Sequence, residues 1–123
     1  MTFEFVHGLI YVPIQIDYAD QQVKLRAIVD TGSAGTAADI NLFNIDYSRD
    51  ARIRDLVGIG GKERVIVQSV ERVAFGNAVC EQFPIEFSDM DGAFDVEAIV
   101  GGDLLERIGA VIDYPARQLR YRS

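Results

Sequence analysis

RAIVDTGSAGT, residues 26–36, carries an apolar strand end directly into Asp-Thr-Gly. Ile28 and Val29 are β-branched and apolar, which predicts a buried strand. That strand would deliver the Asp30 carboxylate to the edge of the core. Gly32 lets the chain turn sharply because it has no Cβ. An isolated Asp-Thr-Gly is also typical of a strand that ends in an ordinary Asx turn. Other segments of the chain are therefore needed to distinguish a functional carboxylate from a structural turn.

Two further glycine-containing segments follow this one along the chain. VGIGG, residues 57–61, predicts the tip of a β-hairpin, although an ordinary turn would have the same composition. AIVGGDLL, residues 98–105, predicts an apolar strand, a glycine and the start of a short helix. In this order along the chain, the three segments resemble the retropepsin-like aspartic proteases. The resemblance extends from about Leu9 to Tyr121.

The resemblance implies a role for each motif residue. Asp30 matches the catalytic carboxylate, Gly32 the residue whose N–H holds it, and Thr31 the residue whose hydroxyl grips a partner chain. The matching substrate-binding positions are Ser33, Ala34, Ile59, Gly60, Gly61 and Ile99. Residues 59–61 match the tip of the flap that covers an extended peptide, and Ile99 matches the wall of a side-chain pocket.

The family's chemistry needs two carboxylates that share one proton and activate a water molecule. This chain has a single Asp-Thr-Gly. The resemblance therefore implies a homodimeric aspartic endopeptidase that acts on peptides without a metal or other cofactor, each chain contributing one Asp30. Gly102 stands where retroviral enzymes commonly carry a basic residue, so the segment looks closer to cellular and bacterial relatives. The alternative is a retropepsin-fold dimerisation or peptide-binding domain with little or no activity.

Turn-separated strands dominate the rest of the chain. Strands are expected over residues 9–17, 23–29, 51–57, 63–75, 78–87, 110–113 and 118–121. Short helices are expected over residues 36–44 and 103–108. This pattern predicts an all-β fold. The family resemblance further implies a closed retropepsin-like barrel with one or two short helices. The whole chain, residues 1–123, is expected to form one domain.

Composition and charge argue against several classes of partner and binding site. The net charge of −7 argues against nucleic acid and anionic lipid as partners. No apolar run is long enough for a membrane span. The single cysteine, Cys80, excludes an intrachain disulfide and fits a reducing, cytoplasmic location. With one histidine and one cysteine a zinc site is not expected, and the spacing of the acidic residues 89, 91 and 95 does not match a calcium loop.

Overall fold

The computed structural model describes residues 1–58, 61–90 and 95–122 and confirms an all-β fold. The strands are β1 (Glu4–Val6), β2 (Leu9–Tyr18), β3 (Gln21–Val29), β4 (Ala37–Asp39), β5 (Arg52–Gly58), β6 (Gly61–Phe75), β7 (Ala78–Ser88), β8 (Ala98–Val100), β9 (Val111–Asp113) and β10 (Gln118–Arg120). The helices are the 3-10 turn η1 (Ile40–Leu42) and α1 (Gly102–Arg107). Within these described residues, no helix has the length and apolar character needed to cross a membrane.

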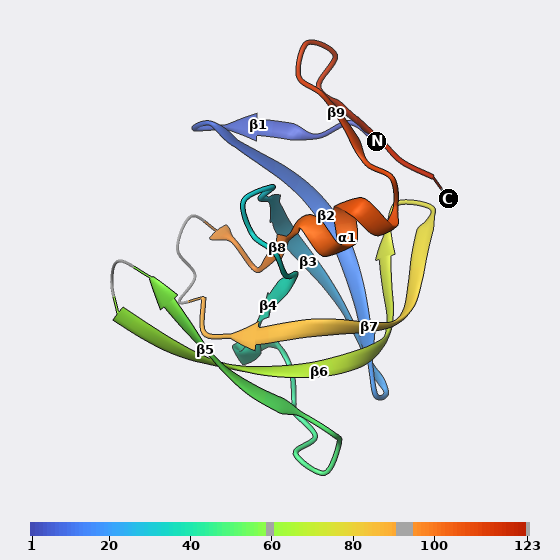
Figure 1. Ribbon diagram of the computed structural model, residues 1–123. Coiled ribbons are helices and arrows are strands. Elements are labelled where there is room, and N and C mark those ends of the chain that lie inside the picture. The colour runs from blue at the N-terminus through green and yellow to red at the C-terminus, as the bar shows by residue number, and fades with distance from the viewer. Residues whose placement is uncertain (59–60, 91–94, 123) are drawn as a thin grey trace.

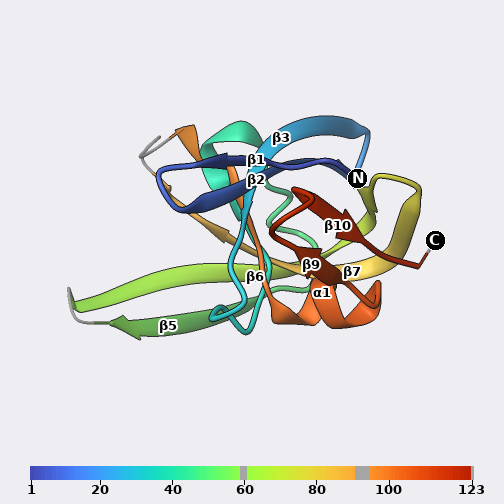
Figure 2. The same cartoon turned by 90° about the horizontal axis from the view of Figure 1, so that it is seen from above.

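The strands form a ring. Their order in the main sheet is β1-β2-β3-β8-β4-β7-β6-β5, and an additional pairing of β2 with β6 joins the two halves of that series. In Figure 1 α1 is seen across the middle of the ring, and Figure 2 shows that it lies on one side of the strands. Figure 2, the view from above, shows the β5–β6 hairpin extending away from the body of the molecule. Strand β6 is part of the ring, and β5 pairs with β6 at the end of the strand series.

The core fills the ring. Strands alternate between faces, and the inward positions are fully buried apolar residues such as Ile16, Val73, Phe75 and Ile85. Helix α1 closes one opening, with Leu104 and Ile108 among the core residues. Fully burying a side chain of this size stabilises the fold by about 1.5–3 kcal/mol. The ring is therefore a rigid frame for the loops at its edge.

The structure corrects the expected helix over residues 36–44. Ala37 and Ala38 form β4, which pairs with β7 on one side and with β8 on the other. Only residues 40–42 turn, as the 3-10 helix η1, and the Asp39 carboxylate caps it by accepting from the Asn41 N–H. Two unoccupied strand edges outweighed the weak helical preference of this segment.

The two ends of the chain pair with each other within one molecule. The Phe3 N–H donates to the Arg117 carbonyl at 2.9 Å, and the Leu119 N–H donates to the Met1 carbonyl at 2.8 Å. Strand β10 also pairs with β9, so both of its edges are used. The strand-like composition of residues 3–6 predicts strand β1, which stands at the end of the strand series.

Candidate active site

Asp30 stands directly after β3, at the place where β3 runs parallel to β8. Ile28 pairs with Ile99 in that ladder, and the Asp30 N–H donates to the Val100 carbonyl at 2.9 Å. The Asp30 side chain is exposed, and its Oδ1 accepts from the Gly32 N–H at 2.9 Å. The carboxylate is thus oriented by its own loop and open to a ligand.

Gly101 allows the Asp30 loop to pack on the end of β8. A Cβ at this glycine would lie 2.2 Å from the Gly35 carbonyl oxygen and 2.9 Å from that of Ser33, so no side chain fits there. The Gly102 N–H donates to the Ser33 carbonyl at 2.7 Å, and the Asp103 N–H donates to the Ala34 carbonyl at 3.2 Å. The backbone at the start of α1 therefore holds the loop from behind.

A buried polar link completes this support. Thr36 is fully buried, and its hydroxyl donates to Asp103 Oδ1 at 2.7 Å. The same hydroxyl accepts from the Gly101 N–H at 3.1 Å. Buried hydrogen-bonding groups are costly to leave unpaired, so this link defines one arrangement of loop and helix.

The remaining predicted residues lie around the loop or outside the described part of the chain. Thr31 and Ala34 are exposed, while the half-buried Ser33 donates from its hydroxyl to the Gly35 carbonyl at 2.9 Å. Ile99 is half-buried on β8. The predicted hairpin is present, since Gly58 pairs with Gly61 in the β5–β6 ladder. The predicted tip residues Ile59 and Gly60 lie outside the described residues.

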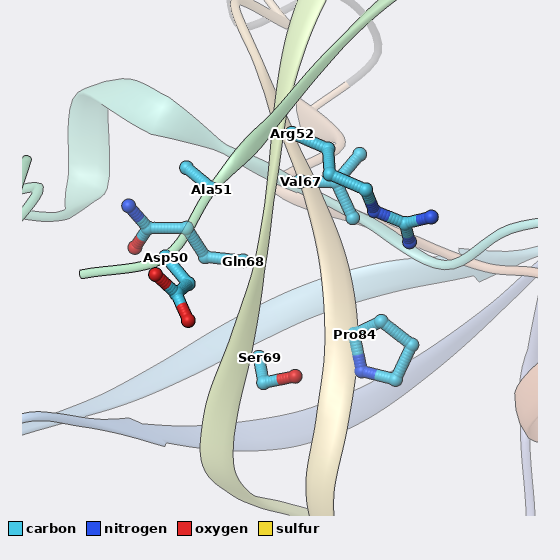
Figure 3. Close-up of a pocket in the computed structure, with 7 residues that line it drawn as sticks. All are labelled: Asp50, Ala51, Arg52, Val67, Gln68, Ser69 and Pro84. Atoms are coloured by element: carbon cyan, nitrogen blue, oxygen red, sulfur yellow. The ribbon is translucent and has the colours of Figure 1, made fainter.

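A shallow cavity of about 410 Å³ lies on the outer side of the β5–β6–β7 sheet. Its lining includes Arg52 and Val67, which pair across β5 and β6, and Pro84 of β7 (Figure 3). Asp30 is not part of this lining. The cavity lies on β5 and β6, the strands of the predicted flap, together with β7.

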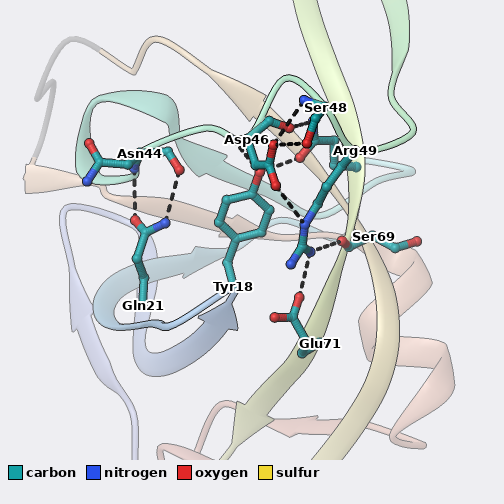
Figure 4. A network of polar contacts seen from close by, with 9 residues as sticks. Tyr18, Gln21, Asn44, Asp46, Ser48, Arg49, Ser69 and Glu71 are labelled. Carbon is teal, nitrogen blue, oxygen red and sulfur yellow. Dashed lines mark hydrogen bonds and ion pairs between the residues drawn. The ribbon is translucent and has the colours of Figure 1, made fainter.

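A second polar cluster anchors the segment between η1 and β5. Tyr18, fully buried, donates from its hydroxyl to Gln68 Oε1 at 2.5 Å and accepts from the Asp46 N–H at 2.8 Å. Arg49 lies over the Tyr18 ring and donates to Glu71 Oε1 at 2.6 Å (Figure 4). This hydrogen bond lowers the pKa of the Glu71 carboxyl. Each of these polar side chains has a hydrogen-bond partner within the cluster, which indicates that the cluster has a structural role.

The cysteine thiol and the potential metal ligands of the described residues are poorly placed for catalysis. Cys80 is buried, and this burial raises the pKa of its thiol, which makes the nucleophilic thiolate scarce. Within the described ranges, no three His, Cys, Asp or Glu side chains gather as metal ligands would. An exposed, oriented carboxylate on a rigid loop can accept a proton from water. Two such carboxylates held close together would share one proton.

Two residues beside the Asp30 loop, Thr36 and Glu86, have no sequence motif that predicts their role. A lone threonine four residues after Asp-Thr-Gly gives no local signal, because its partners lie some 65 residues away. Glu86 occupies an outward position in the alternating strand β7, which predicts exposure, yet it is buried. Its burial depends on neighbouring strands that local periodicity does not report.

Comparison of the chain with protein-family models found no match, and a search of curated proteins found none either.

Proposed function

We propose that this chain is one half of a homodimeric aspartic endopeptidase, with its ring of strands forming a closed retropepsin-like barrel. The observation that carries the proposal is the exposed Asp30 carboxylate, oriented by the Gly32 N–H at 2.9 Å. The strand, glycine and helix start over residues 98–105 support its loop from behind. A carboxylate held this firmly at the surface is suited to chemistry, because it needs no rearrangement to meet a substrate.

The second half of the site comes from a second copy of the chain. Two Asp30 carboxylates facing each other across a two-fold axis would share one proton, because two close negative charges are costly. The ionised member takes a proton from water, and the resulting hydroxide attacks the peptide carbonyl carbon. The protonated member donates its proton to the carbonyl oxygen. As the C–N bond then breaks, the first carboxyl gives the proton taken from water to the leaving nitrogen, and the second takes a proton back from the tetrahedral diol, which restores the pair. In this arrangement the exposed Thr31 faces the partner chain beneath the pair.

The N-terminal strand β1 provides a sheet edge at which a second chain can bind. Strand β1 stands at the end of the strand series, and its Phe5 exposes apolar surface together with Tyr114. The Phe5 and Tyr114 rings are in edge contact at 5.7 Å between centroids. Exposed apolar surface at a strand edge favours association with another chain. We therefore place the two-fold contact at this end of the molecule.

The decisive experiment is cleavage of a peptide library by the wild type and by Asp30→Asn. The amide keeps the size of the carboxylate and cannot act as the base, so activity should fall to background while the unfolding midpoint stays unchanged. Asp20→Asn, an exposed aspartate in the β2–β3 turn, is the matched control and should keep full activity. Full activity of a pure Asp30→Asn sample would refute the proposal. Peptide binding without cleavage by the wild type would favour the binding-domain alternative.

A further inference from the structure

One row of residues crosses the sheet from β3 to the predicted flap. Successive pairs in the ladders give the row its members, namely Ile28, Ile99, Ala37, Glu86, Val67 and Arg52. Paired residues project to the same side of a sheet. The neighbouring row, which includes Ala27, Ala98, Ala38 and Phe87, belongs to the core. The first row therefore lies on the opposite face, and it starts two residues before Asp30.

Glu86 is the one acidic residue in this row, between Ala37 and Val67. It is 7% exposed. A Cβ on Gly35 would lie 2.1 Å from Glu86 Oε2, so the carboxylate rests directly against the Asp30 loop. A buried carboxylate is costly unless a cation compensates it. The compensating cation is Arg54 of β5, whose Nη1 lies 3.8 Å from Glu86 Oε1.

Arg54 contacts Glu86, which lies against Gly35, and is otherwise open to solvent. Its side chain is 50% exposed, compared with 10% for the side chain of Glu86. A guanidinium has five N–H donors, so its contact with Glu86 leaves donors for a second carboxylate. Arg52 lies two residues earlier on the same strand face and is exposed (Figure 3). Arg54 and Arg52 thus place two guanidinium groups on this face of β5, with the buried Glu86 against Arg54 and Asp50 in the same cavity lining as Arg52.

We propose that Arg54, held beside Gly35 by Glu86, is a specificity-determining residue that favours an acidic side chain in the bound peptide. The inference rests on the proposed function, because the peptide must lie across the Asp30 loop. A peptide extended between that loop and the β5–β6 hairpin would pass next to Arg54. The charge of Arg54 is opposite to the net charge of −7 of the whole chain, so selection by this residue is a local effect.

The test is a cleavage profile over a peptide library in which one position at a time is Asp, Glu, Asn, Gln or Lys. The wild type should prefer the acidic residue over its amide at one position by about fivefold, the upper range for a half-exposed ion pair. Arg54→Gln should remove the preference, Arg54→Lys should retain part of it, and Arg54→Glu should shift it to lysine. Arg72→Gln is the matched control, because Arg72 is also 50% exposed in an ion pair, with Glu81 at 3.5 Å.

The outcomes separate this inference from the proposed function. Cleavage that depends on Asp30 and has the same profile in wild type and Arg54→Gln would overturn the role of Arg54 alone. A wild-type preference for lysine that grows in Arg54→Gln would assign selection to Glu86 and also overturn it. Absence of any cleavage that depends on Asp30 would overturn both proposals. Because Arg54→Gln removes the cation beside the buried Glu86, its unfolding midpoint should fall below that of Arg72→Gln. The profiles are therefore compared at a temperature well below both midpoints and as ratios between peptides, which general destabilisation does not change.

Discussion

Thr36 and Asp103 are 67 residues apart in the chain, yet a 2.7 Å hydrogen bond from the Thr36 hydroxyl to Asp103 Oδ1 joins the Asp30 loop to helix α1. The Thr36 N–H also points at this carboxylate, at 3.3 Å from Oδ2. Asp103 in turn accepts from the Leu104 N–H at 2.7 Å. One carboxylate in the first turn of α1 thus holds the loop.

Thr36→Val tests this link, since valine keeps the shape of threonine and removes the hydroxyl. The Gly101 N–H and the Asp103 carboxylate would each lose a buried partner, so the free energy of unfolding should fall by about 1–3 kcal/mol. Denaturant titration measures the change. Thr2→Val, at an exposed threonine, is the control and should stay within about 0.5 kcal/mol of the wild type. Equal small effects at both positions would show that the link contributes nothing.

Gly101→Ala tests the close approach of loop and strand. The new methyl group would overlap the Gly35 carbonyl oxygen, 2.2 Å away, and the backbone would have to move. We expect a loss of about 1–3 kcal/mol in stability, together with a loss of Asp30-dependent activity. At Gly102 the nearest atom would be 3.5 Å away, an ordinary contact. Gly102→Ala should therefore be neutral or stabilising, and similar thermal midpoints for the two variants would contradict this explanation.

Mixing experiments test whether the active unit holds two chains. Wild-type chains diluted with Asp30→Asn at constant total concentration should lose activity with the square of the wild-type fraction, because mixed dimers hold one carboxylate. Dilution with Asp20→Asn, which keeps Asp30, should leave total activity unchanged. A linear decline in the first series, with only monomer in sedimentation, would rule out a shared pair.

The Arg49–Glu71 contact predicts a pH-dependent contribution to stability. Its hydrogen bond lowers the pKa of Glu71 in the folded chain, so the contribution is fully present above the ordinary glutamate pKa. It should disappear as the pH falls through the lowered value. Glu71→Gln should thus be less stable than the wild type near pH 7 and approach it in acid, as measured by chemical unfolding at several pH values. A difference that does not change with pH would contradict the prediction. The exposed pair Arg72–Glu81 provides the comparison, through Glu81→Gln.

Cys80 should be inert in the folded protein. Burial raises the pKa of its thiol, and the side chain lies among core residues of the ring. Alkylation by iodoacetamide should therefore be far slower in the native protein than in denaturant, as followed by intact mass. Peptidase activity should survive native treatment with the reagent. Rapid native labelling together with loss of activity would point to a thiol mechanism instead.

Local patterns in the sequence determined most of the strands and the position of Asp30. The run of β-branched residues at 28–29 ends in a carboxylate and a glycine, and the structure has β3 ending at Val29 with Asp30 exposed after it. The segment 98–105 contains the predicted strand and helix start. Such signals are readable because alternation, turn residues and glycine act over a few neighbouring residues.

Tertiary structure decided the rest. Ala37 and Ala38 are strand residues only because β7 and β8 lie on either side of them. Glu86 is buried because Gly35 and Arg54, from distant parts of the chain, lie against its carboxylate. The hydroxyl of Thr36 has its partners on the helix side of the loop for the same reason. These features arise from contacts between segments far apart in sequence, whose energies depend on the closed ring and leave no periodic trace in the local order of residues.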